Sequence, residues 1–375
     1  MKHLHLLIKP ASSLCNLRCK YCFYEDEAIN RTQHSMGMMQ EELADTLIKQ
    51  AFEAVDPDGT VSFAFQGGEP TLAGLPFFQH FVCQARECCP PNVQVNFSIQ
   101  TNGILLDDAW ARFLKEAQFL VGLSLDGFRE AHELHRVDVS GCGTWKQVLR
   151  AKKLLEKHGV AHNGLCVVTG RCAAHPEQAY KTMRQLGFHY IQFIACLDLI
   201  GHERGCEPWS LTPDAYGKFL CRVFDLWYQD WVTGNYHSVR LFEDYVHILL
   251  GDGSGTCSTC GNCGSYLVIE SDGSAYPCDF FALDEWKIGT LSQMTVLQMA
   301  ESKAAAAFLR WRTEKPAECL HCPYGRICNG GCKNDWVTDD TGTHNYYCRA
   351  FRSFLDYAFP RLRRIAEAEW HARHN

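Results

Sequence analysis

Three cysteines near the N-terminus have the spacing of ligands for a metal–sulfur centre. Cys15, Cys19 and Cys22 form a Cys-x3-Cys-x2-Cys sequence, followed directly by Phe23 and Tyr24. Three thiolates this close can bind one small cluster, and a cubane iron–sulfur cluster with three protein ligands keeps its fourth iron open to an external ligand. A zinc site of three cysteines and a distant histidine is the alternative. Because the triplet follows a predicted strand end, we favour the open iron, where a substrate or cofactor can bind.

A second group of cysteines lies in the last third of the chain. Its members are Cys257, Cys260, Cys263, Cys278, Cys319, Cys322, Cys328, Cys332 and Cys348. Zinc ribbons use two Cys-x2-Cys pairs, but the downstream run has one such pair and five thiols. The fifth thiol is expected to complete a second site with the upstream cysteines. Two fully ligated clusters have no vacant iron, so they would transfer electrons or fix structure.

The composition limits the compartment and the partners. The chain has 375 residues and 21 cysteines, and its N-terminal apolar run is short and interrupted by His5. Disulfide frameworks are typical of short secreted chains, so this cysteine content indicates metal-bound thiolates in a reducing cytoplasm. The net charge of −7 argues against nucleic acid as a partner, and no apolar stretch is as long as a membrane span.

The elements that must position the first triplet alternate between strands and helices. Six strands are predicted at Leu4–Ile8, Thr60–Phe65, Val93–Ile99, Phe119–Leu125, Ala161–Val168 and Tyr190–Ile194. Amphipathic helices are predicted between them, at Glu41–Ala54, Leu75–Ala85, Asp107–Glu116, Trp145–His158 and Pro176–Leu186. Repeated strand–helix units imply a parallel sheet, and six of them predict an open (β/α)6 partial barrel of the α/β class.

Polar or glycine-rich turns follow the predicted strands, and the carboxyl ends of parallel strands share one edge. That edge is expected to collect the cysteine triplet with further polar side chains, namely Glu69, Gln100, Ser124 and Asp126. The simpler reading is that the turn glycines merely end strands. Several such turns at one rim instead indicate an active site.

The strand–helix alternation stops after Leu211. Two helices are predicted at about Pro213–Trp231 and Leu241–Leu250, then a hairpin at Tyr266–Pro277 that turns on Asp272-Gly273. The last segment, about Phe351–His374, is predicted to be a helix interrupted at Pro360. The expected division is a barrel domain over 1–235, a cysteine-rich domain over 236–348 and a helical segment over 349–375.

The cysteine patterns resemble two known families. The N-terminal triplet resembles the signature of radical S-adenosylmethionine (radical SAM) enzymes, and Cys319 to Cys348 resembles the SPASM extension, which holds two auxiliary clusters. Four further stretches are similar to the anaerobic sulfatase-maturating enzymes: Ile8-Lys9-Pro10-Ala11-Ser12-Ser13, Phe65-Gln66-Gly67-Gly68-Glu69-Pro70-Thr71-Leu72-Ala73-Gly74, Gln100-Thr101-Asn102-Gly103 and Tyr276-Pro277-Cys278-Asp279-Phe280. The similarity extends over essentially the whole chain.

The resemblance implies three [4Fe-4S] clusters and S-adenosylmethionine on the open iron. Glu69 would bind the amino group of this cofactor, and Ser124 and Leu197 would lie near its ribose and adenine. The implied ligands of the first auxiliary cluster are Cys257, Cys263, Cys278 and Cys332, and those of the second are Cys319, Cys322, Cys328 and Cys348. Cys260 is not part of the family pattern, and it could replace Cys257 or Cys263 as a cluster ligand.

Further residues are assigned to the cofactor and to the substrate peptide. Tyr24, Gly67 and Gly68 are expected on the cofactor side, and Gln66 and Gln100 on the peptide side. The alternative for Tyr24, Gln66 and Gln100 is that each holds the cluster loop or a strand end by hydrogen bonds.

The reaction implied by the resemblance is oxidation of a cysteine or serine in a sulfatase to Cα-formylglycine. A cofactor-derived radical would remove hydrogen from the substrate Cβ, and a proton and an electron would follow. Asp279 is the candidate base; its alternative role is to cap a turn. The pKa values of an ordinary aspartate and an ordinary thiol differ by roughly 4.6 units, so proton transfer from the thiol to the aspartate costs about 6 kcal/mol. The site must therefore bring the two pKa values closer together.

The partners implied are an unfolded sulfatase segment of the Cys/Ser-x-Pro-x-Arg type and an electron donor such as flavodoxin or ferredoxin. Two other functions compete with this one. A peptide-crosslinking maturase shares the scaffold but usually carries an N-terminal peptide-binding module, whereas here the first strand begins almost at Met1. A non-catalytic protein folded around structural zinc is the second.

Overall fold

The computed structural model describes residues 1–261, 263–264, 266–311, 315–340 and 342–374. Its ten-stranded sheet has the order β10-β9-β8-β1-β2-β3-β4-β5-β6-β7. The strands of this sheet are β1 (His3–Lys9), β2 (Thr60–Phe65), β3 (Gln94–Thr101), β4 (Leu120–Ser124), β5 (His162–Val168), β6 (Tyr190–Ala195), β7 (Ser238–Val239), β8 (Leu267–Glu270), β9 (Ser274–Tyr276) and β10 (Gly289–Thr290). A separate antiparallel pair consists of β11 (Trp336–Asp339) and β12 (Gly342–Asn345).

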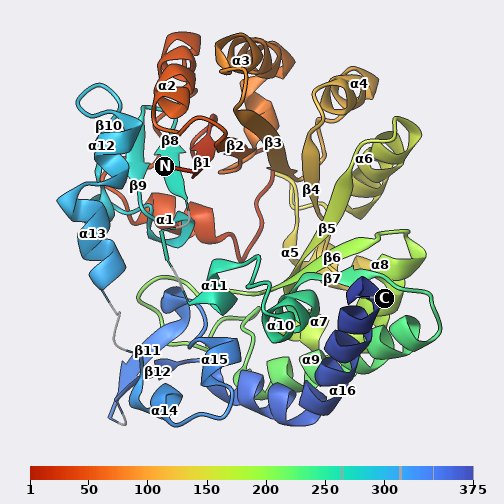
Figure 1. The fold of residues 1–375 in the computed structure, drawn as a ribbon. Helices are drawn as coiled ribbons and strands as arrows, with labels where there is room; N and C mark the ends of the chain where they lie inside the picture. Colours follow the sequence, from red (N-terminus) through yellow and green to blue (C-terminus); the bar gives the residue numbers. More distant parts are fainter. Residues whose placement is uncertain (262, 265, 312–314, 341, 375) are drawn as a thin grey trace.

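Helices cover the outer side of the parallel strands and continue beneath them (Figure 1). The longer helices are α1 (Phe23–Ile29), α2 (Glu41–Glu53), α3 (Leu75–Cys88), α4 (Asp108–Glu116), α5 (Arg129–His135), α6 (Trp145–Lys157), α8 (Pro176–Gln185), α9 (Pro213–Val232), α10 (Arg240–Leu250), α13 (Lys303–Arg310) and α16 (Cys348–His374). The shorter ones are α7 (Gly170–Ala173), α11 (Cys257–Cys260), α12 (Val296–Ala300), α14 (Ala317–Leu320) and α15 (Gly325–Cys328). Four 3-10 turns are η1 (Pro70–Ala73), η2 (Asp279–Phe281), η3 (Asp284–Trp286) and η4 (Lys333–Asp335).

The six predicted strands are confirmed as β1 to β6, and each pairs with the next in parallel. Alternation explains why they form: Leu4, Leu6 and Ile8 of β1 are buried in the core, whereas His3 and His5 are exposed. The predicted partial barrel is therefore correct.

The sheet contains more strands than the six predicted from the sequence. At one edge β7 pairs in parallel with β6, and at the other β8 pairs in parallel with β1. The predicted hairpin is confirmed as β8 and β9, which turn at Gly273 with a φ of +82°. The cysteine-rich region thus begins as a continuation of the barrel sheet, and Lys9 lies opposite Glu270 in the register.

The predicted break of the last helix at Pro360 is wrong. Helix α16 runs through Pro360 from Cys348 to His374. Proline removes one backbone donor, but buried Leu355 and Leu362 lie on either side of it, and the helix packs against α9 and α10. Burial of this apolar face offsets the lost hydrogen bond.

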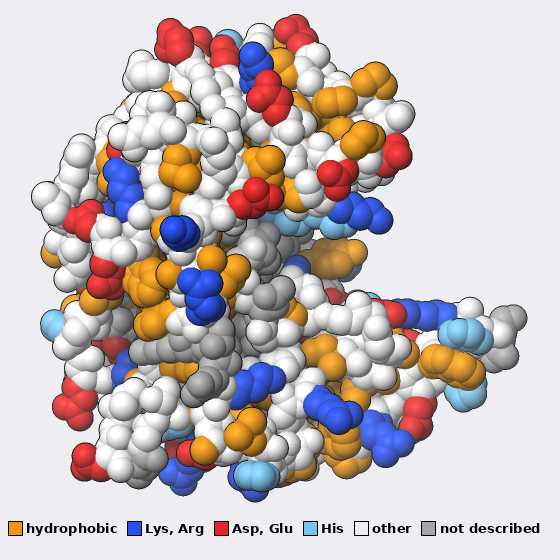
Figure 2. All heavy atoms as spheres, turned by 60° about the vertical axis from the view of Figure 1, so that its left-hand side comes forward, with side chains coloured by type: hydrophobic (Ala, Val, Ile, Leu, Met, Phe, Trp, Pro, Cys, Tyr) orange, Lys and Arg blue, Asp and Glu red, His pale blue; other side chains and the backbone are white. Residues whose placement is uncertain are grey.

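One face of the molecule is mixed in charge (Figure 2). Acidic and basic side chains alternate over the face drawn in Figure 2, with no continuous basic area on it. None of the helices in the described ranges combines the length and apolar character needed to cross a membrane.

Candidate active site

The cysteine triplet lies in the loop between β1 and α1. The pKa of the Cys15 thiol is raised to about 11 and that of Cys19 to about 12, mainly by burial and in smaller part by the neighbouring thiols. Burial likewise raises the pKa of Cys22. Cys22 raises the pKa of both other thiols, so the three lie close together, and they become thiolates readily only when a cation compensates their charge. The loop is therefore suited to bind the three-ligand cluster that its spacing indicates.

The glycines after β2 allow the next turn to pack against this loop. A Cβ atom on Gly68 would lie 2.1 Å from the carbonyl oxygen of Leu14, and Gly67 has a φ of +119°. The backbone amide of Glu69 donates a 2.8 Å hydrogen bond to the same Leu14 oxygen. A side chain at Gly68 would push this turn away from the cysteine loop.

The Glu69 carboxylate is buried and is held by neighbours within the turn and after β3. Its Oε1 accepts hydrogen bonds from the amide and hydroxyl of Thr71, at 3.1 and 2.5 Å, and from the Thr101 hydroxyl at 2.7 Å. Its Oε2 accepts one from the Asn102 amide at 2.8 Å. A carboxylate has about four lone-pair positions, two on each oxygen, so Oε2 is the atom with capacity for a further donor such as an ammonium group.

Asp126, after β4, joins the cysteine loop to the barrel. It accepts hydrogen bonds from the hydroxyl of Tyr21, from the Val167 amide at 2.9 Å and from two nitrogens of Arg136, at 3.0 and 3.1 Å. Both members of the Arg136–Asp126 pair are almost completely buried. Asp126 was predicted at the rim, but its partners Arg136 and Tyr21 were not. The positions of polar residues along a chain do not show which of them pair.

A cavity of about 1000 Å³ runs along the inner face of the barrel to the cysteine-rich region. Gln66, Leu197 and Asp279 line it, as predicted site residues would. Its polar floor comes from alternate residues of the strands, including His5, Ser62, Asn96, Ser98 and Gln192. Tyr24, Glu69, Gln100 and Ser124 lie outside its lining.

Tyr24 is buried in a charged cluster behind this cavity. Its hydroxyl donates a hydrogen bond to Glu270, which also accepts a 2.7 Å bond from Arg31. The Nζ atom of Lys9 lies 3.4 Å from the centre of the Tyr24 ring. The Tyr24 hydroxyl thus bonds to the last residue of β8, a strand end, as the alternative expects; its role toward the cofactor stays a prediction.

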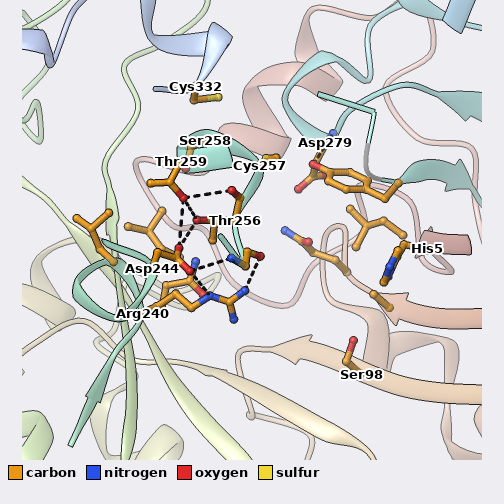
Figure 3. A pocket seen from close by; sticks show the side chains of 18 of the residues that line it. His5, Ser98, Arg240, Asp244, Thr256, Cys257, Ser258, Thr259, Asp279 and Cys332 are labelled. Carbon is orange, nitrogen blue, oxygen red and sulfur yellow. Dashed lines mark hydrogen bonds and ion pairs between the residues drawn. The ribbon is translucent and has the colours of Figure 1, made fainter. Parts of the chain in front are cut away.

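Asp279 is one of three acidic residues, with Asp244 and Asp335, that line the cavity from the cysteine-rich region. It begins η2, directly after Cys278, and its Oδ1 lies 2.5 Å from the Nζ of Lys9. In Figure 3 it faces the cavity from the side of His5, opposite Arg240 and Asp244. The sequence analysis did not identify Lys9 because 270 positions separate it from its partner.

The eight thiols predicted to hold the auxiliary clusters line two smaller cavities. A space of about 200 Å³ is lined by Cys257, Cys263, Cys278 and Cys332. One of about 40 Å³ is lined by Cys319, Cys322, Cys328 and Cys348. Within the described residues, no three metal-binding side chains converge on a point that would hold a single ion; the thiols surround spaces instead. The two sets match the two predicted ligand groups.

Cys260 lies outside the lining of both cavities. Its thiol is exposed and donates a 3.4 Å hydrogen bond to the carbonyl oxygen of Cys257. Cys257 and Cys332 line the 200 Å³ space and also the large cavity, so the two spaces adjoin.

The segment that carries Cys257 is tied to α10 by Asp244. This buried carboxylate accepts hydrogen bonds from the Gly255 amide at 3.0 Å and from the hydroxyls of Thr256 and Thr259 (Figure 3). The Arg240 side chain donates to the Gly255 carbonyl at 2.7 Å. These contacts, which the sequence analysis missed, fix the start of α11.

Two protein-family models match the chain. The model described as "Radical SAM superfamily" matches residues 10–186, and the one described as "Iron-sulfur cluster-binding domain" matches residues 257–323. The two matches contain the cysteine triplet and most of the second cysteine group.

Curated relatives match over almost the whole chain. A cysteine-type anaerobic sulfatase-maturating enzyme of Clostridium perfringens is 43% identical over 98% of this chain and 99% of its own length. The corresponding enzyme of Clostridium novyi is 40% identical over the full length of both chains. A serine-type enzyme of Bacteroides thetaiotaomicron is 29% identical over 96% of this chain and 90% of its own.

Solved structures agree with these relatives. The structure described as "Native anSMEcpe with bound AdoMet and Cp18Cys peptide" has a TM-score of 0.91 at 42% identity and covers 98% of this chain and 99% of that one. Streptococcus suis SuiB bound to S-adenosylmethionine has a TM-score of 0.60 at 17% identity, over 88% of this chain and 73% of that one, and shares the fold. Because the curated relatives match over almost the whole chain at 40 and 43% identity, the chain belongs to the anaerobic sulfatase-maturating enzymes of the radical SAM superfamily.

Proposed function

We propose that this enzyme oxidises a cysteine of a sulfatase polypeptide to Cα-formylglycine. The relatives of 40 and 43% identity are cysteine-type enzymes, whereas the serine-type relatives are 29 to 32% identical, which supports cysteine as the preferred residue. The observation that carries the proposal is the position of Asp279. It lies in the wall of a cavity of about 1000 Å³, next to the cluster ligand candidate Cys278.

The residues present suit the cofactors of this family. Cys15, Cys19 and Cys22 would hold the first cluster, and the thiols around the two smaller cavities would hold the auxiliary clusters. When bound, S-adenosylmethionine and the first cluster supply the radical that removes a hydrogen atom from the substrate Cβ. Oε2 of Glu69 would accept a hydrogen bond from the amino group of this cofactor, and Leu197 would contact its adenosine part.

Asp279 would take the proton of the substrate thiol on its Oδ2 atom. Its Oδ1 atom is already bound by Lys9, at 2.5 Å. The ammonium group of Lys9 thereby fixes the position of the carboxylate, and Oδ2 is the oxygen proposed to receive the proton. The auxiliary cluster site adjoins the same cavity through Cys257 and Cys332, so an electron acceptor would lie near the substrate.

The peptide would enter the polar cavity of the barrel. Gln66 lines this cavity and is proposed to contact the peptide backbone. Gln100, on β3 and outside the lining, is proposed to support the strand end. A segment of the Cys-x-Pro-x-Arg type would be the substrate, with flavodoxin or ferredoxin as the electron donor in a reducing cytoplasm.

The test is anaerobic reconstitution with iron and sulfide, followed by mass spectrometry of matched Cys and Ser peptides incubated with S-adenosylmethionine and a reductant. An aldehyde at the target residue, formed faster from the Cys peptide, is expected. Cofactor cleavage with a thioether crosslink instead of an aldehyde would show a peptide-crosslinking maturase.

The role of Asp279 has its own test. Asp279→Asn should cleave the cofactor at close to the normal rate but form formylglycine about 10² times more slowly, because general-base catalysis contributes at least this much. Normal product formation by this variant would rule out Asp279 as the base.

A further inference from the structure

Lys9 is a completely buried lysine at the end of β1. Its side chain is 0% exposed, its Nζ lies 2.5 Å from Oδ1 of Asp279, and the same nitrogen lies 3.4 Å from the centre of the Tyr24 ring. Removing a charged amine from water costs several kcal/mol unless partners compensate it. Asp279 and the Tyr24 ring are these partners.

The Lys9–Asp279 pair joins two regions that are distant in sequence. Lys9 ends the first barrel strand, whereas Asp279 begins η2 after the β8–β9 hairpin. Asp279 lines the large cavity and Lys9 lies outside that lining. Lys9 thus contacts Oδ1 of Asp279 from outside the lining of the cavity.

A second buried carboxyl group faces the same lysine. Glu27 is 2% exposed; its Oε1 accepts a 3.3 Å hydrogen bond from the Ala282 amide, and its Oε2 has no partner among the described residues. Burial raises the pKa of Glu27 to about 8, with Lys9 acting in the opposite direction and Asp279 in the same one. At neutral pH Glu27 is therefore mostly uncharged.

The other charges behind the cavity are paired with each other. Arg31 bonds to Glu270 at 2.7 Å, and the Tyr24 hydroxyl donates to the same carboxylate. When Glu27 is uncharged, Asp279 is the carboxylate that forms an ion pair with Lys9.

We infer that Lys9 is a positioning residue of the reaction, which holds Oδ1 of Asp279 and so keeps Oδ2 turned to the substrate. This inference rests on the proposed role of Asp279 as the base. Stability alone does not account for the pair, because a buried ion pair is often no more stabilising than apolar side chains of the same size.

The experiment compares Lys9→Met with a matched control, Lys152→Met. Lys152 is also buried, with its Nζ 2.5 Å from Glu156 and 4.9 Å from the centre of the Phe188 ring, but it lies on α6, away from the cavity. Each reconstituted variant is assayed for iron content, the KM of a Cys peptide, and formylglycine formed per 5′-deoxyadenosine released.

Lys9→Met is expected to lower formylglycine per 5′-deoxyadenosine by about tenfold or more, while KM and iron content change little, because loss of orientation affects the proton-transfer step. Lys9→Arg, which keeps the charge, should retain more product than Lys9→Met, and Lys152→Met should match the parent enzyme. Lys9→Gln, with a polar head group that a buried site accepts more readily, replaces Lys9→Met if the latter does not fold.

An unchanged product ratio in the Lys9 variants, or an equal loss in Lys152→Met, would overturn the inference. Asp279→Asn in the same assay separates the two proposals. Normal product from this variant would refute the base itself, whereas loss in Asp279→Asn together with normal product from the Lys9 variants would refute only the role of Lys9.

Discussion

The hydroxyl of Tyr21 donates a hydrogen bond to Asp126, and this bond links the loop that holds the cysteine triplet to the end of the fourth strand. Tyr21 stands between Cys19 and Cys22, so the geometry of two predicted ligands depends on a residue 105 positions away. Arg136 completes this arrangement with a paired contact to the same carboxylate.

Asp126→Asn should destabilise the protein and reduce the binding of the first cluster. The change leaves the buried Arg136 without its counter-ion, and breaking a buried ion pair typically costs about 3–5 kcal/mol. Urea unfolding under anaerobic conditions and iron analysis would measure the two effects. Asp108→Asn, which changes contacts of a half-exposed carboxylate with the exposed Lys157 and the partly buried His158, is the control and should lose much less stability. Equal stability of the two variants would contradict the prediction.

Gly68→Ala should abolish cofactor cleavage. The added Cβ would lie 2.1 Å from the Leu14 carbonyl oxygen, so the turn that carries Glu69 must move away from the cysteine loop. Gly141→Ala is the matched control: its φ is +79° but no atom lies within 4 Å of the added carbon, so only backbone strain of about 1–2 kcal/mol is expected. The release of 5′-deoxyadenosine is the measurement, and normal release by Gly68→Ala would disprove the close approach.

Cys257→Ala should lower the iron content by one auxiliary cluster, about four irons per chain, whereas Cys260→Ala should not change it. The thiol of Cys257 lines the 200 Å³ cavity, and that of Cys260 is exposed outside it. Iron and sulfide analysis with Mössbauer spectroscopy shows which of the two cysteines is the cluster ligand. The reverse result would assign the ligand to Cys260.

Glu27→Gln should stabilise the protein increasingly as the pH rises from about 5 to 8. Burial raises the pKa of Glu27 from 4.5 to about 8, so the folded state holds a proton that the unfolded state has released over this range. The contribution of this proton is complete below pH 4.5 and is lost as the pH rises through 8. Glutamine does not ionise, so the variant does not lose stability when the parent's Glu27 becomes charged inside the folded protein. The difference in unfolding free energy between the variant and the parent should therefore grow with pH.

Urea unfolding at several pH values measures this difference, with the exposed Glu42→Gln as control. A difference that stays constant with pH would show that Glu27 is already ionised in the folded protein.

The sequence alone predicts the parallel barrel and the cysteine triplet and, through the family resemblance, the two further sets of cysteine ligands. Alternation in β1 to β6 and the helical patterns between them are local properties, so a single chain reveals them. The cysteine spacings are local as well, and so is the Gly67-Gly68 turn that packs against the triplet.

Which side chains meet depends on how the whole chain packs. The tertiary structure paired Lys9 with Asp279 and Arg136 with Asp126, and it buried Tyr24 behind the cavity. It also turned Cys260 away from both thiol cavities, joined β8 to β1 and carried α16 through its proline. Such contacts depend on how distant segments pack and on the burial of charge against charge, and no local pattern along the chain encodes either one.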